Sequence, residues 1–526
     1  MEIFELAIAL LLGGALLALL ANRIAVPYPA LLALAGTVIA LLPGTPEITL
    51  DPELALALFV APILLDAAYD ASPRDLRDNL VPVLNLALFA VGATIVAVAV
   101  VARLVIPDMG WATAIALGAI VAPPDASAAT AVLRRLSPPH RILILLEGES
   151  LFNDATALIV YRIAVVAAIT GTFSPWNVML MLVLIGVGSL IAGIGLARAY
   201  LWLTSRVEDV PVWVLLQFIG TFAVWLIAER VGLSPIIAVV SYAMTLARRA
   251  PARMDARRRI VSYAVWEVVV FVLNVLAFLL IGLQISGILD RTHATDMGAY
   301  LMSVAAVCAT VVIVRPVWWM PWNAFVRWRI RRYGPRVRRP TMLPSAGSGL
   351  VISWAGMRGI VTLAAALALP PDMPHRDFIL LAAFGVVLST LVLQGLTLGP
   401  LMNRVCLHPD DSVDREISLA RVETARAALR ALEDADDGRA AEILRAEYEA
   451  RMQSGKRGSA ATSENPETSS LARLQGVAVA AQRRELFNLR ERGVIGDDAF
   501  HALEEELDVL ELTADARIRP DVMRGE

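Results

Sequence analysis

Long apolar runs separated by short polar loops fill the chain from residue 3 to residue 402. About thirteen of these runs are long enough to cross the ~30 Å hydrocarbon core of a bilayer as helices. They cover residues 3–22, 26–43, 52–71, 80–105, 111–135, 141–169, 176–203, 210–229, 234–248, 260–288, 298–319, 347–369 and 377–402. The pattern predicts an all-α polytopic membrane protein.

The charge of the loops alternates along this series. Every second loop carries arginine, most densely at residues 247–259 and 327–339, whereas the loops between them are neutral or acidic on balance. Loops rich in Arg and Lys stay on the cytoplasmic side. We therefore predict an N-terminus outside the cell and a C-terminus in the cytoplasm.

The pattern changes after Asn403, where long apolar runs stop. Residues 411–452 place apolar side chains at helical spacing among mixed charges, and 454–470 is a Ser- and Gly-rich stretch typical of a flexible linker. A further helical pair is expected at 472–492 and 496–514. The sequence thus predicts a transmembrane domain at 1–403 and a cytosolic helical tail at 404–526, which is either a solvated appendage or a regulatory or dimerising element.

Composition supports a membrane protein and excludes several other classes. The chain is 57% hydrophobic and 18% charged, well outside the average of soluble domains. Its net charge of -3 gives no basis for a nucleic-acid partner, and its two cysteines make no metal or disulfide spacing. No Ser/His or HExxH arrangement lies in the spans, so we predict neither an enzyme nor a cofactor.

The stretch LEGESLFNDATALIVYR, residues 146–162, places carboxylates inside a predicted span. Such groups cost roughly 2.5–3.5 kcal/mol each at membrane depth, so they face a partner, water or a transported ion. On a helix, Glu149 shares a face with Asn153, and Ser150 shares a face with Asp154, about 100° away. Carboxylate, hydroxyl and amide oxygens are hard ligands suited to a small alkali cation.

Two other spans are predicted to be broken. Pro123 and Pro124 remove two amide donors just before Asp125, although a Pro pair alone is also compatible with a simple kink. Gly356 and Gly359 bracket Arg358 in a later span. Interrupted helices in two halves of a chain indicate an inverted-repeat transporter whose breaks line an ion site.

A buried arginine needs an anionic partner, and few cations are available inside the bundle. We predict that Arg358 pairs with Glu149, whereas Arg315 is assigned to a span end where its side chain reaches the interface. Asp154 would then have no permanent cation beside it. A partly desolvated carboxylate of that kind can hold a proton or a metal cation, but not both well.

Three further polar residues are open to two interpretations. Asp66 is either a ligand or a residue near a cytoplasmic helix end. Glu267 and Asn274, seven apart on one helix face, are interpreted as an interhelical polar contact in preference to a part of the ion site.

At these residues the chain resembles the sodium/proton exchanger branch of the monovalent cation/proton antiporters, in particular the bacterial members. The resemblance covers most of residues 1–403. Its motifs are GESLFND at 148–154, PILLDAAYD at 62–70, PPDASAAT at 123–130, FLLIGLQI at 278–285 and GMRGIVTLAAALALP at 356–370.

The resemblance implies a thirteen-helix fold of two inverted repeats, a homodimer and an elevator-like movement of a core domain. It implies that Asp154 is the shared cation and proton site with Asn153 beside it, and that Ser150 and Asp66 are further ligands. An Asn-Asp pair resembles the branch that exchanges ions electroneutrally. The chain departs from many relatives in having Pro124 where a Thr is common, and Asp66 where Glu is commoner.

We therefore expect an antiporter of a bacterial inner membrane that exchanges Na⁺, with K⁺ or Li⁺ as alternatives, for H⁺. A cation channel or sensor with the same fold but no coupled exchange is the alternative hypothesis.

Overall fold

The computed structural model describes most of the chain up to residue 431. Gaps fall at residues 1, 25, 44–50, 134–135, 137, 172–174, 251–255, 292–296, 335–343, 406 and 408–411. Beyond 431 it describes only residues 445, 446, 448, 449, 452, 453, 482 and 509. The predicted linker at 454–470 lies outside the described residues, as does almost all of the helical pair expected after it.

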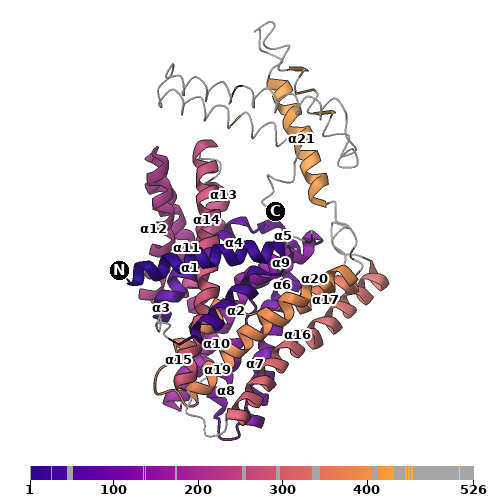
Figure 1. Cartoon of the computed structure of the whole chain (residues 1–526). Helices are drawn as coiled ribbons and strands as arrows, with labels where there is room; N and C mark the ends of the chain where they lie inside the picture. Colours follow the sequence, from indigo (N-terminus) through magenta and orange to yellow (C-terminus); the bar gives the residue numbers. More distant parts are fainter. Residues whose placement is uncertain are drawn as a thin grey trace. The chain divides into compact units, whose positions relative to one another are not determined.

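All regular elements in the described part of the chain are helical, which confirms the predicted fold class (Figure 1). They are α1 Glu2–Arg23, α2 Tyr28–Ala40, α3 Pro52–Ala55, η1 Leu56–Val60, α4 Ala61–Asp70, α5 Pro73–Asp78, α6 Leu80–Leu84, η2 Asn85–Ala90, α7 Val91–Val105, α8 Trp111–Val121, α9 Ala126–Leu133, α10 His140–Thr170, α11 Pro175–Leu203, η4 Thr204–Arg206, α12 Val210–Arg230, α13 Pro235–Arg249, α14 Ala256–Leu283, α15 Ile285–Arg291, α16 Met297–Tyr333, α17 Ala346–Trp354, α18 Ile360–Leu367, α19 Arg376–Ser389, η7 Thr390–Gln394, α20 Gly395–Arg404 and α21 Ser412–Ala431.

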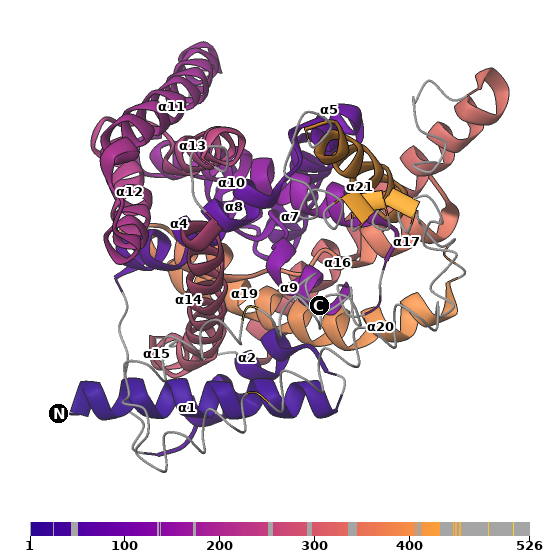
Figure 2. The same cartoon turned by 90° about the horizontal axis from the view of Figure 1, so that it is seen from above.

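Nine of the helical segments in the described residues are long and apolar enough to cross a membrane. Two shorter apolar helices, Ile8–Arg23 and Tyr28–Ala40, accompany them. Helix lies within each of the thirteen predicted runs, while the number of membrane crossings stays a prediction. Figure 2 shows α11 and α12 at one edge of this bundle and α1 at another.

Two helices are interrupted where the sequence places its breaks. One chain segment leaves helix between Val121 at the end of α8 and Ala126 at the start of α9, and another between Trp354 of α17 and Ile360 of α18. Proline removes amide donors in the first break, which prevents a continuous helix. The two breaks touch, because the Asp125 amide donates a 2.7 Å hydrogen bond to the Met357 carbonyl.

Small residues bring α2 and α14 into backbone contact. A Cβ on Gly36 would overlap the Leu279 carbonyl, and one on Gly282 would overlap the Ala33 carbonyl. Only glycine therefore fits at either position, as is common where membrane helices approach closely.

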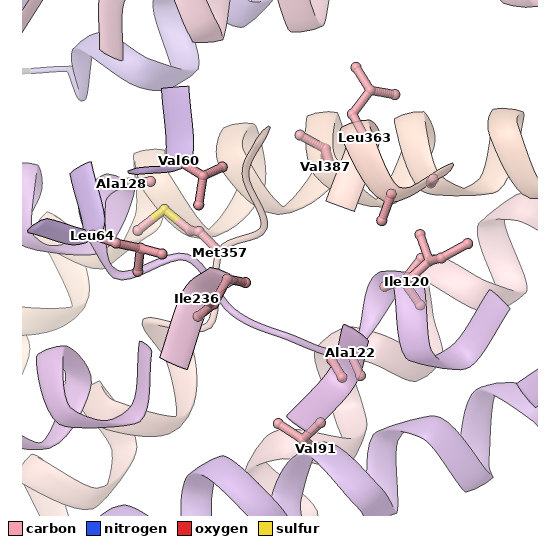
Figure 3. Close-up of a cluster of buried hydrophobic side chains, with 14 of the residues drawn as sticks. Val60, Leu64, Val91, Ile120, Ala122, Ala128, Ile236, Met357, Leu363 and Val387 are labelled. Carbon is pink, nitrogen blue, oxygen red and sulfur yellow. The ribbon is translucent and has the colours of Figure 1, made fainter. Parts of the chain in front are cut away.

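Apolar side chains fill the space around the two breaks. Met357, from the second break, belongs to the same buried cluster as Val60, Leu64 and Ala128 (Figure 3). The breaks are thus embedded in packed protein, which is the condition for irregular backbone at membrane depth.

Contacts within the chain separate two compact units, Met1–His408 and Pro409–Glu526. The first contains all the helices from α1 to α20. In the second, α21 repeats apolar positions along a mostly polar helix, and the side chains of Val422 and Ala425 are buried.

Candidate functional site

A cavity of about 40 Å³ lies beside the break between α8 and α9. Its walls come from η1, α4, the α8–α9 break, α10, α14 and α18. Its polar lining residues are Asp125, Ser127, Ser150, Asp154, Asn274 and Thr362. A space of this size holds a small cation or a few water molecules, since one water needs roughly 10–15 Å³ on this measure.

Two carboxylates line the cavity, and Asp154 is the one to which no described residue donates a hydrogen bond. Its side chain is 6% exposed, and its carboxylate makes no hydrogen bond or ion pair with any residue that the structure describes. Ser150, one turn earlier on α10, lines the same cavity. A buried carboxylate without a partner is costly, so the geometry requires a cation, a proton or water at this point.

Asp125 also lines the cavity, but its carboxylate already has local partners. Its Oδ1 accepts hydrogen bonds from the Ser127 amide at 2.8 Å and the Ser127 hydroxyl at 2.6 Å, at the start of α9. Its Oδ2 lies so close to Gly359 that a Cβ there would overlap it. Asp125 thus stabilises the start of α9 with one oxygen, while the other packs against Gly359 of the second break.

Asn153 lies beside Asp154 in sequence but does not line the cavity. Its amide donates a 2.7 Å hydrogen bond to the Pro124 carbonyl, which the α8–α9 break leaves without a helical partner. The side-chain oxygen Oδ1 of Asn153 is buried and has no partner in the described part of the chain. Asn153 therefore holds the break against α10, about 100° around the helix from the cavity.

Asp66 also lies outside the cavity wall. It follows Ile63 and Leu64 on α4, which do line the cavity, and its side chain is half-buried. The structure thus brings Asp154, Ser150 and Asp125 together and leaves Asp66 and Asn153 outside that group.

The ion pair of Glu149 differs from the sequence prediction. Glu149 accepts two hydrogen bonds from the Arg315 guanidinium, at 2.5 and 2.6 Å, so the pair is bidentate. Both side chains are buried, at 1% and 3% exposure. The predicted pairing of Glu149 with Arg358 is therefore wrong.

Arg315 was assigned to a span end, and this assignment is also wrong. The predicted span stops at residue 319, whereas α16 continues through Pro316 and Pro321 to Tyr333. Arg315 therefore lies in the middle of a long helix. Its guanidinium also donates to the Ile352 carbonyl at 3.2 and 3.1 Å, near the end of α17.

The Arg358 guanidinium donates hydrogen bonds to backbone carbonyls instead of pairing with a carboxylate. Its Nε donates to the Val121 carbonyl at 2.8 Å and its Nη1 donates to the Gly356 carbonyl. Its amide donates to the Thr390 hydroxyl at 3.0 Å. Carbonyls released by both breaks thus replace Glu149 as its partners.

Asn274 and Thr362 are site residues that the sequence analysis did not select. Asn274 was interpreted, together with Glu267, as an interhelical polar contact, but it lines the cavity while Glu267 is exposed. Burial changes along α14, so two residues on one face meet different surroundings. Thr362 follows the second break, and its hydroxyl is buried without a described partner. Its position just after the GMRG motif at 356–359 was the sequence feature that could have indicated it.

The side-chain atoms around this cavity that could coordinate a cation are oxygen atoms. Among the described residues, no group of three or more His, Cys, Asp or Glu side chains could hold a metal ion. Two carboxylates with hydroxyl and amide oxygens suit a hard monovalent cation taken as substrate.

A family model described as "Sodium/hydrogen exchanger, transmembrane" matches residues 7–404. An uncharacterised Na⁺/H⁺ exchanger of Mycobacterium tuberculosis is 31% identical, over 94% of this chain and 93% of its own length. A sodium, potassium, lithium and rubidium/H⁺ antiporter of Bacillus subtilis is 30% identical, over 93% of this chain and 74% of its own.

The fold is also that of a solved structure, the sodium proton antiporter of Methanocaldococcus jannaschii. The TM-score is 0.58 at 19% identity, with 77% of this chain and 99% of that chain covered. These matches confirm the resemblance in the motifs. The chain belongs to the sodium/hydrogen exchanger family and is a multi-pass cation/proton antiporter.

Proposed function

We propose that the protein exchanges Na⁺ for H⁺ at Asp154, with K⁺ and Li⁺ as further candidate cations. The observation that carries this proposal is the Asp154 carboxylate, which faces the cavity without a described partner. A carboxylate in low dielectric must be neutralised by a proton or by a cation. Binding of one therefore opposes binding of the other.

Ser150, Thr362 and Asn274 would supply neutral oxygen ligands around the cation. Asn153 and Arg358 keep the two breaks in position through the Pro124 and Val121 carbonyls. We give Asp66 no direct contact with the cation in this conformation, because it lies outside the cavity wall.

One proton for one cation follows if a single carboxylate changes occupancy. Asp125 already accepts two hydrogen bonds from Ser127, which favours Asp154 as the exchanging group. The exchange would then move no net charge across the membrane.

A cavity of about 40 Å³ has room for the ion and only a few water molecules. Exchange requires this site to open to each side of the membrane in turn. We propose that this occurs in a homodimer in a bacterial inner membrane, with the N-terminus outside and the C-terminus in the cytoplasm.

Proteoliposomes with an internal pH dye test the proposal. Wild-type protein should acidify or alkalinise the lumen when a Na⁺ gradient is imposed, and Asp154→Asn should lose this activity. Glu267→Gln removes an exposed carboxylate of the same domain and should retain activity, which makes it the matched control. Normal exchange by Asp154→Asn would refute the assignment.

Competition makes a second, kinetic test possible. Lowering the pH should raise the apparent KM for Na⁺ while the maximal rate at saturating Na⁺ is kept. Cation flux without proton counterflow would instead support a channel.

A further inference from the structure

A second and much larger cleft, of about 980 Å³, opens at one end of the bundle. It is bordered by α5, α6, the first turn of α10, the last turn of α13 and the C-terminal half of α16. None of its lining residues belongs to the cation cavity.

The cleft carries an excess of positive charge. Five arginines line it, Arg74, Arg77, Arg141, Arg248 and Arg329, against one carboxylate, Asp78. Arg74 is bonded to Asp75, whose other oxygen lies 3.8 Å from His140. The other four arginines make no hydrogen bond or ion pair with any described residue.

Two buried donors in the cleft wall also lack an acceptor. Trp319 is 3% exposed and its indole N–H has no described partner. The Nε of Arg141 is likewise buried without a partner. A buried donor without an acceptor is destabilising, and so the cleft suits a ligand with several acceptor oxygens.

Most of the remaining wall is apolar, and Asn79 and Asn323 are its polar members. It includes Trp322, Phe325, Val81 and Ile330. The ligand that fits both parts combines an anionic, oxygen-rich group with a hydrocarbon chain.

The position of the cleft identifies the source of such a ligand. Arg77 precedes the span Leu80–Val105, Arg141 opens the span His140–Thr170, and Arg329 lies near the end of Tyr300–Tyr333. Residues at span ends lie at the depth of lipid headgroups. Arginine also pairs with phosphate through two parallel hydrogen bonds.

We propose that this cleft binds an anionic phospholipid, with its phosphate between Arg141, Arg248 and Arg329 and an acyl chain along Trp322 and Phe325. The Trp319 indole donates to a headgroup oxygen. Trp319 lies one turn after Arg315 on α16, and Arg141 lies two turns before Glu149 on α10. The lipid therefore joins the same two helices as the buried ion pair.

The test uses delipidated full-length protein in detergent, with binding of phosphatidylglycerol, phosphatidylcholine and inorganic phosphate followed by native mass spectrometry and thermal unfolding. Phosphatidylglycerol should bind and raise the unfolding temperature, and phosphatidylcholine should do so far less. Arg248→Gln/Arg329→Gln should weaken phosphatidylglycerol binding about tenfold or more, since each basic residue contributes about one factor of five at an anionic surface.

The matched control is Arg206→Gln/Arg230→Gln, which removes two exposed arginines that do not line the cleft. It should bind phosphatidylglycerol as the wild type does. Equal binding of both lipids, or equal losses in the two double variants, would overturn the proposal. Stabilisation by inorganic phosphate alone, with no response to either lipid, would overturn it in favour of a soluble anion.

Discussion

The bidentate pair between Glu149 and Arg315 gives a sharp prediction about stability. Glu149→Gln leaves the Arg315 guanidinium buried at 3% exposure without a counter-charge, because its remaining acceptors, the Gln amide oxygen and the Ile352 carbonyl, are neutral. Removing one member of a buried ion pair costs about 3–5 kcal/mol, because the remaining charge is not compensated. At about 2 °C per kcal/mol for a large domain, the apparent unfolding temperature should fall by roughly 5–10 °C.

A double-mutant cycle tests whether Glu149 pairs with Arg315 or with Arg358. The variants are Glu149→Gln, Arg315→Gln and the double variant, with unfolding followed by dye fluorescence in one detergent. The double variant should be less destabilised than the sum of the single variants by at least about 2 kcal/mol, since it leaves no buried unpaired charge.

The same cycle with Arg358→Gln in place of Arg315→Gln is the control. Arg358 donates to the Val121 and Gly356 carbonyls, not to Glu149, so its coupling to Glu149 should be clearly smaller. Equal coupling in the two cycles, or wild-type stability of Glu149→Gln, would refute the assignment of the pair.

Three further variants test the site and the tail. Gly359→Ala places a Cβ against the Asp125 carboxylate and should lower both stability and exchange. Gly92→Ala, with no atom near the added Cβ, is the control and should be neutral. Thermal unfolding compares the stability of the two variants. Asn274→Ala removes one neutral ligand worth about 1 kcal/mol and should raise the apparent KM for Na⁺ about fivefold in proteoliposomes, and an unchanged KM would remove Asn274 from the site. Truncation after His408 keeps the first compact unit whole and should retain basal exchange in the same assay, while complete loss would mean that the tail is required.

The helical fold could be predicted because lipid imposes a length and a hydropathy on every span. The breaks at Pro123 and Gly356 were also readable, since proline and glycine act on the backbone locally. The shared face of Ser150 and Asp154, both of which line the cavity, followed from helical spacing within α10. These features depend on residues close together in the sequence.

The partner of Glu149 depends on residues far apart and could not be read in this way. Arg315 looked interfacial because the span was expected to end at residue 319, yet α16 continues to Tyr333. Arg358 looked in need of a carboxylate, but the carbonyls freed by the breaks satisfy it. The sequence does not show which polar backbone groups a break will expose to a distant side chain.

The glycine contact between α2 and α14 has a mechanical consequence for the cavity. Gly282 lies on the same helix as Asn274, Ala277 and Phe278, which form one wall. Because the backbones touch at Gly36 and Gly282, these two helices cannot slide past each other without a clash. We therefore expect α2 and α14 to act as one rigid plate. Opening the cavity then means displacing α10 and the two breaks relative to that plate.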